Sequence, residues 1–163
     1  MMKYRRFFAA VIGWLLCIAA VGMFIFPWSG KKQSPYAERD KDGNIMIKAE
    51  SLFKDKVSFI RIEEESRIEL LAILGENGEI RIAFGACQSC NGSPYAYYTQ
   101  KGDRLICNNC GASLPISELG EPGGGCHPIM IPEELIHKTE EGLVLETDGI
   151  MEYEKYFEKV IAH

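Results

Sequence analysis

The chain has 163 residues, of which 47% are hydrophobic and 25% are charged, as is ordinary for a globular protein of one domain. Its 23 acidic residues outnumber its 18 lysines and arginines, which gives a formal net charge of −5. This acidic balance argues against nucleic acid or an anionic membrane surface as a partner.

The hydrophobic residues gather near the start of the chain, where residues 7–28 include no charged side chain. Such a run is long enough for one helix to cross a bilayer core about 30 Å thick. It exceeds the apolar region of a cleaved signal peptide, and the bulky Leu16 before Cys17 disfavours a lipoprotein. We therefore predict a single transmembrane helix that embeds the protein in the lipid bilayer of the cell membrane. Three basic residues within residues 1–6 favour a cytoplasmic tail, and the C-terminal domain is then extracytoplasmic.

Residues 29–44 follow the predicted span and are polar and turn-rich, with no periodic apolar face. We interpret them as a juxtamembrane linker. The folded domain is then expected to occupy residues 45–163, a length sufficient for one small core.

The first half of this domain has the β-branched residues and the partial alternation of strands. Strands are predicted at residues 56–63 and 67–74, and a hairpin turn at Asn77-Gly78 leads into a third strand at 80–84. Leu71 and Ile73 indicate that the second face of this sheet is partly covered as well. The apolar residues expected to share the first face are Ile68, Leu70, Ala72, Leu74, Ile80, Ile82 and Phe84.

Two Cys-x-x-Cys pairs enclose a second predicted hairpin, with strands at 95–99 and 104–107 and a turn at 100–103. A β-ribbon with such a pair at each end is typical of zinc-ribbon and rubredoxin-like sites, because each turn directs two thiolates at one point. The spacing C-x2-C-x16-C-x2-C falls in the range of four-cysteine metal sites. Zinc, a single iron and an iron-sulfur cluster all suit four thiolates, and spacing does not choose among them. The four predicted ligands are Cys87, Cys90, Cys107 and Cys110.

Two other uses of these cysteines stay open. Outside the cytoplasm they could form structural disulfides, which would leave an odd cysteine in the domain. One pair could instead be a redox dithiol, although both pairs flank a β-ribbon rather than begin a helix.

The odd cysteine is Cys126, in the glycine-rich stretch "GEPGGGCHP". Three glycines permit backbone conformations that would press this thiol against a neighbouring site. Cys126 is therefore a fifth candidate ligand, and the equal alternative is a buried thiol in a loop. The adjacent His127 is a further candidate, but an exposed loop histidine is favoured.

The end of the chain adds packing rather than chemistry. Residues 142–149 are predicted to form a strand and a turn. Residues 150–162 are predicted to form an amphipathic helix with Ile150, Tyr153, Phe157 and Val160 on one side. The expected fold class is thus α+β, a β-rich domain with a four-cysteine metal site and a C-terminal helix. No Ser/His/Asp set or phosphate loop is present, so a metal-binding or electron-transfer protein is favoured over an enzyme.

The motifs "GACQSC", "SPYAYY", "CNNCG" and "GGCHP" occur in this order, and together they resemble the FtrD-like membrane iron-sulfur proteins. The resemblance extends from the strands near Lys56 to Pro132. Gly85 stands where that family is expected to have aspartate, and His127 where it is expected to have asparagine. The resemblance implies that the five cysteines from Cys87 to Cys126 are characteristic, and it implies an association with iron uptake beside an iron permease.

Three functions therefore follow from the sequence. The leading one is a membrane-anchored iron or iron-sulfur protein that transfers electrons or delivers iron in iron transport, with an iron permease or a redox partner in the membrane. The second is a structural zinc ribbon that acts as an interaction module. The third is a membrane-tethered thiol-disulfide oxidoreductase.

Overall fold

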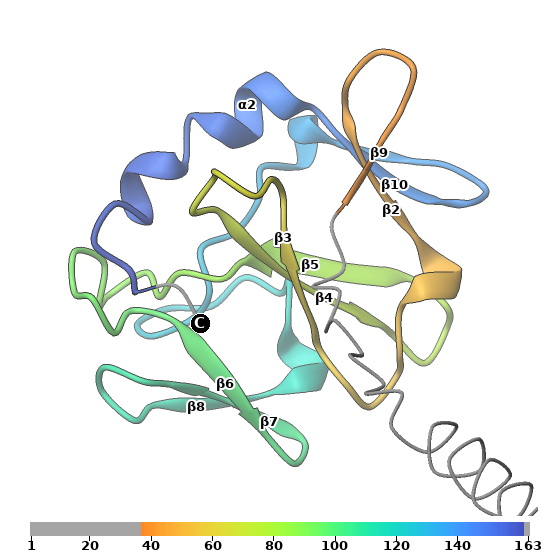
Figure 1. Ribbon diagram of the computed structural model, residues 1–163. Coiled ribbons are helices and arrows are strands. Elements are labelled where there is room, and N and C mark those ends of the chain that lie inside the picture. The colour runs from red at the N-terminus through yellow and green to blue at the C-terminus, as the bar shows by residue number, and fades with distance from the viewer. Residues whose placement is uncertain (1–36, 162–163) are drawn as a thin grey trace, which may run out of the picture. The chain divides into compact units, whose positions relative to one another are not determined.

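A computed structural model describes residues 37–161 of the chain (Figure 1). The predicted cytoplasmic tail and transmembrane helix, and the first part of the predicted linker, lie outside the described residues. Within residues 37–161, no helix combines the length and the apolar character that crossing a membrane requires.

The described residues form three small antiparallel sheets. The first has the order β1-β2-β10-β9, with strands Glu38–Arg39, Ile45–Lys48, Gly142–Leu145 and Ile136–Lys138. The second has the order β3-β4-β5, with strands Ser58–Arg61, Glu69–Leu74 and Ile80–Phe84. The third has the order β6-β7-β8, with strands Tyr98–Lys101, Arg104–Cys107 and Ser113–Pro115. Short 3-10 helices lie at Ala49–Ser51 (η1), Ile116–Glu118 (η2), Glu133–Leu135 (η3) and Glu154–Tyr156 (η4).

The first sheet begins inside the segment expected to be a linker. Glu38 of β1 lies opposite Met46 of β2, and the salt bridge of Glu38 with Lys48 spans the same pair of strands at 2.6 Å. A turn at 40–43, in which Gly43 has a φ of 84°, reverses the chain between them. Part of that polar segment therefore joins a sheet.

The central sheet confirms the predicted hairpin, and residues expected to share a face lie opposite one another. Leu70 lies opposite Phe84, and Ala72 lies opposite Ile82. Strand β4 is buried on both faces, as Leu71 and Ile73 indicated, because alternate side chains enter two different cores. A continuous apolar run such as "ELLAIL" is what a strand covered on both sides requires.

Two cores therefore lie on opposite faces of the central sheet. The first packs Leu70 and Phe84 against the first sheet and the C-terminal segment. The second packs Leu71 and Ile73 against the sheet of β6, β7 and β8, and includes Cys87 and Cys107. Figure 1 shows the central sheet between the other two, so the domain has three layers. Cys87 and Cys107 thus belong to the second hydrophobic core, and Cys90 and Cys126 pack against it.

The predicted helix at 150–162 is wrong in its extent. The α-helix α2 covers Thr147–Met151, starting within the predicted turn, and η4 follows it. Beyond α2 the backbone makes successive bonds to the third residue back, such as Phe157 N–H to the Glu154 carbonyl at 2.8 Å. This tighter winding accompanies the packing of aromatic rings on Phe84, where Tyr153 stacks at 4.4 Å between ring centroids. Tertiary packing here overrides the helical pattern.

The second predicted hairpin is confirmed, with a shift of its first strand. Strand β6 begins at Tyr98 rather than at residue 95, because a tight turn at Pro94 and Tyr95, closed by the Ala96 N–H and the Ser93 carbonyl, bends the chain before it. The hairpin turn lies at Gly102, whose φ of 60° favours glycine. Strand β8, which the sequence did not predict, pairs with β7 and completes the sheet.

Candidate metal centre

Each Cys-x-x-Cys pair lies just after a strand or at its end. Strand β5 leads the chain to Cys87, whose N–H donates to the Ala96 carbonyl at 2.9 Å. Strand β7 ends at Cys107. The bridge between Ala86 and Tyr97 joins the first segment to the start of β6, which pairs with β7 in the third sheet. The edge of the central sheet and the end of the third sheet are thereby brought together at the cysteines.

Both pairs form tight turns whose backbone N–H groups approach the sulfurs. The N–H groups of Asn109 and Cys110 approach the sulfur of Cys107, and the N–H of Cys90 approaches that of Cys87. Gly111 continues the second turn with a φ of 75°, which explains a glycine directly after Cys110. Such donors stabilise thiolate and are the usual hydrogen bonds around metal-bound sulfur.

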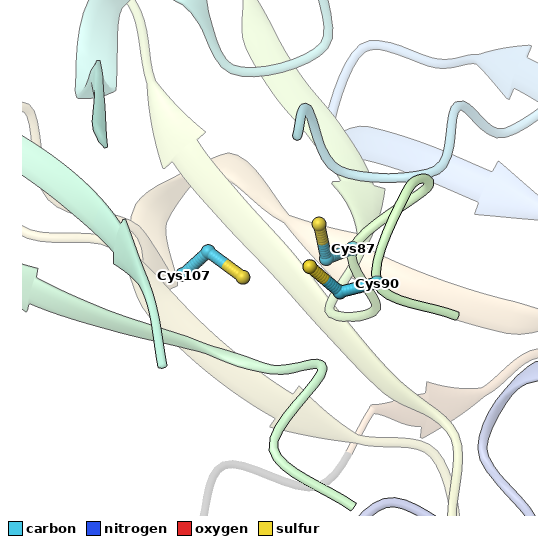
Figure 2. Close-up of side chains that lie close together, drawn as sticks. All are labelled: Cys87, Cys90 and Cys107. Atoms are coloured by element: carbon cyan, nitrogen blue, oxygen red, sulfur yellow. The ribbon is translucent and has the colours of Figure 1, made fainter. Parts of the chain in front are cut away.

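The five sulfurs gather into two overlapping groups. The sulfurs of Cys87, Cys90 and Cys107 lie within 4.8 Å of one another. Those of Cys90, Cys110 and Cys126 form a second group within the same limit. Figure 2 shows the side chain of Cys107 pointing toward the turn that carries Cys87 and Cys90. The four predicted ligands thus fall into two groups that share Cys90: Cys87 and Cys107 lie with it in one group, and Cys110 lies with it and Cys126 in the other.

The five cysteines differ in how far solvent reaches them. Cys87 and Cys107 are fully buried in the second core, whereas Cys110 is exposed. Cys90 and Cys126 are half-buried. All five are free thiols, so no disulfide occurs in the part of the chain that the structure describes. The cluster therefore has a buried side and a side open to solvent.

The surroundings move the thiol pKa values in different directions. Burial raises the pKa of Cys107 to about 12, although backbone N–H groups oppose it. Burial acts in the same direction on Cys87, but the neighbouring Tyr98 side chain and the Cys90 N–H outweigh it and lower the pKa. The Ala112 N–H, together with the Cys126 side chain, lowers the pKa of Cys110 to about 7. The surroundings of Cys110 therefore favour its thiolate form.

Tyr98 is a residue of the site that the sequence analysis placed only in a strand. Its side chain is fully buried, and its hydroxyl donates to the Cys126 carbonyl at 2.7 Å. Burial, followed by the hydrogen bond with Cys87, raises the pKa of Tyr98 far above its ordinary value, so the hydroxyl stays a neutral donor. The register of the β6–β7 hairpin could have identified Tyr98, because it places Tyr98 directly opposite Cys107.

Backbone contacts hold the glycine-rich loop of Cys126 against the first Cys-x-x-Cys turn. The Gln88 N–H donates to the His127 carbonyl at 3.0 Å, and the Ser89 hydroxyl donates to the Gly125 carbonyl at 2.6 Å. A β-bridge pairs Cys87 with Pro128. These contacts fix the loop at several points, and they position Cys126 beside the other cysteines.

His127 does not join the cysteines. Its Nδ1 lies 2.7 Å from the Gly124 carbonyl oxygen, and its Nε2 faces Glu118 at 4.0 Å. A Cβ at Gly123 would lie 2.2 Å from the imidazole Cδ2, so the ring occupies the space that this glycine leaves. The ring serves to close the loop. Among the described residues, the groups with metal-binding geometry consist of cysteines only.

Gly85 leaves room for a carboxyl group from the neighbouring strand. Its N–H donates to the Glu69 backbone carbonyl at 2.7 Å. A Cβ at Gly85 would lie 3.0 Å from Glu69 Oε1. A side chain at this position would therefore require Glu69 to shift by a few tenths of an ångström.

The comparisons with known proteins bear on this cluster. A sequence profile described as "Membrane iron-sulfur containing protein FtrD-like" matches residues 52–157, which include every cysteine of the cluster. No curated protein matches the chain, and no solved structure matches it.

Proposed function

Because the chain belongs to the FtrD-like family of membrane iron-sulfur containing proteins, we propose that its domain holds an iron or iron-sulfur centre through Cys87, Cys90, Cys107 and Cys110. The observation that carries this proposal is the convergence of sulfurs from two Cys-x-x-Cys turns that lie far apart in the sequence. When bound, such a centre supplies a reversible one-electron couple.

The residues present fit an iron centre by their chemistry. Thiolates are the ligands of iron-sulfur clusters and of mononuclear iron, and the cluster offers them with no carboxylate or imidazole among the grouped donors of the described residues. The N–H groups aimed at Cys87 and Cys107 stabilise negative sulfur and tune a reduction potential. The burial of these two cysteines keeps water from half of the site.

The exposed side of the cluster supports a role that involves a partner. Cys110 reaches solvent, so a partner protein could approach the centre closely there. We propose electron transfer or iron delivery in the service of iron transport, beside an iron permease or a redox partner. The predicted span at residues 7–28 would anchor the domain on the outer face of the cell membrane.

A structural zinc ribbon is the second candidate. The observation that favours it is the β-hairpin of β6 and β7, which together with two tight Cys-x-x-Cys turns is the framework of zinc-ribbon domains. In that role the metal would only stabilise the fold. Zinc has no accessible redox couple, which separates the two candidates experimentally.

The test uses the full-length chain, purified in detergent without oxygen and reconstituted with iron and sulfide. We expect a defined iron stoichiometry and a visible or paramagnetic spectrum that changes reversibly on reduction. Serine variants at Cys87, Cys90, Cys107 or Cys110 should lose most of the bound iron, whereas Cys17→Ser should retain it. The proposal fails if iron neither binds stoichiometrically nor titrates while zinc restores the fold at one per chain. Equal losses at all cysteines, Cys17 included, would indicate general misfolding instead.

A further inference from the structure

Four thiolates complete a tetrahedral site, yet five sulfurs gather in this cluster. The sulfur of Cys126 lies 3.2 Å from that of Cys110, a direct contact between the two side chains. This contact involves the most exposed cysteine of the cluster, whereas Cys87 and Cys107 are fully buried. The surplus thiol is therefore placed against the ligand that solvent reaches most easily.

The position of Cys126 is built rather than accidental. The Tyr98 hydroxyl binds its carbonyl at 2.7 Å, and the Ser89 hydroxyl binds the preceding carbonyl of Gly125 at 2.6 Å. Gly125 has a φ of 70°, a conformation that directs the chain into Cys126 and that favours glycine. A disulfide requires the sulfurs to close to about 2.05 Å, a small movement from the contact observed.

We propose that Cys110 and Cys126 form an oxidisable dithiol that reacts with low-molecular-mass disulfides and thereby opens the metal site. This inference rests on the proposed function only for its effect on metal. Oxidation would remove Cys110 from the ligand set and leave Cys87, Cys90 and Cys107, whose sulfurs already form a group within 4.8 Å. Three protein ligands with an open position characterise sites that exchange ligands, in contrast to closed structural sites.

The reaction balances as a thiol-disulfide exchange. The Cys110 thiolate attacks one sulfur of the external disulfide, breaks its S–S bond and releases the first thiolate. The Cys126 sulfur, having lost its proton to solvent, then attacks Cys110 Sγ and releases the second thiolate. Two electrons pass from the cysteine pair to the external disulfide, whose two products take up the two protons.

The first arm of the test needs no metal. The full-length chain carrying Cys17→Ser keeps five cysteines, and it is treated metal-free with oxidised glutathione before denaturing alkylation. We expect the alkylatable thiols to fall by two with no glutathione retained. Digestion with trypsin and a glutamate-specific protease should yield a cross-link between residues 105–118 and the peptide that carries Cys126, with fragmentation placing it on Cys110. A cross-link of Cys87 with Cys90, or no loss of thiols, would overturn the proposal.

Two matched variants sharpen this result. In the same background Cys126→Ser lacks the resolving thiol, so glutathione should remain attached to Cys110. Cys110→Ser should lose both the cross-link and that adduct. If Cys126→Ser still loses two thiols without an adduct, another pair carries the reaction and the assignment is wrong.

The second arm measures metal, with Zn²⁺ as a probe that is itself redox-inert. The oxidised chain should bind Zn²⁺ about tenfold or more weakly than the reduced chain, since even loss of a supporting residue costs roughly 10- to 100-fold. Reduction should restore the affinity. Equal affinity of the two forms would overturn the opening of the site. Should the reduced chain bind neither zinc nor iron, the proposed function would fail while the first arm still decides whether the dithiol exists.

Discussion

Glu69 is a carboxyl group at the start of β4 whose surroundings disfavour its charge. Burial raises the pKa of Glu69 to about 7 from an ordinary value of 4.5, although the nearby Arg61 guanidinium opposes this. The folded protein therefore binds a proton here more tightly than the unfolded chain does. The contribution of Glu69 to the free energy of unfolding should therefore be fully present below pH 4.5 and should be lost as the pH rises to about 7.

The Glu69→Gln variant tests this linkage, because its side chain stays neutral at every pH. Relative to the variant, the parent protein should lose roughly 2–3 kcal/mol in its free energy of unfolding between the two ends of this range. The measurement is urea unfolding followed by far-UV circular dichroism, at several pH values and under reducing conditions. Parallel pH profiles for the two proteins would show that Glu69 is not buried as described.

Individual residues also show where sequence reasoning stops. Spacing predicted that the two Cys-x-x-Cys pairs approach each other, because a β-ribbon with such a pair at each end directs both turns to one side. It did not predict that the sulfurs fall into two groups sharing Cys90. The contribution of Tyr98 depended on which face of its strand is buried. The arrival of Cys126 depended on backbone bonds between two loops, and loop composition does not specify such bonds.

At the scale of elements, β4 separates two environments. Leu70 and Leu71 are both fully buried, yet only Leu71 belongs to the core that includes Cys87 and Cys107. Neighbouring residues of a strand point to opposite faces of the sheet, so the two leucines form a matched pair. The same strand thus supports the metal centre through one face and the rest of the domain through the other.

This pair yields a prediction about the cluster. Leu70→Ala and Leu71→Ala should each lower the free energy of unfolding by about 2–5 kcal/mol, since each creates a cavity in a packed core. Only Leu71→Ala should also speed the native-state alkylation of Cys107 beyond what its global stability explains. The measurement compares alkylation rates with unfolding free energies for both variants. Equal acceleration at equal stability would mean that the two cores act as one.

Elements differ in how far the sequence predicted them. The hairpin of β4 and β5 was predicted from Asn77-Gly78, and alternation predicted which residues share a face, whereas the register of the pairing was not predicted. The C-terminal helix was predicted too long, because Tyr153 and Phe157 recur at helical spacing even though the chain tightens after α2 to pack them on Phe84. Strands β1 and β8 have only two and three residues, which is too short for alternation to be recognised, although each pairs with a strand adjacent in the sequence.

At the scale of the whole molecule, three layers explain why five cysteines from a stretch of about forty residues can meet. The central sheet delivers the first pair, the third sheet delivers the second, and the loop to β9 crosses between them. The second core joins these parts around Cys87 and Cys107. Apolar packing therefore supports the buried side of the cysteine cluster.

The membrane anchor is the last prediction, and it concerns residues outside those the structure describes. If residues 7–28 form an uncleaved transmembrane helix, the full-length protein should stay with membranes through a carbonate wash, and protease added outside intact cells should reach its C-terminal domain. Ile18→Arg places a charge near the middle of the run, where insertion costs about 2.5–3.5 kcal/mol more. This variant should therefore shift protein into the wash, whereas Lys31→Arg, beyond the run, should not. A soluble mature protein that begins near Ser29 would contradict the prediction and identify the run as a cleaved signal, and a protected domain would place the metal centre on the cytoplasmic side.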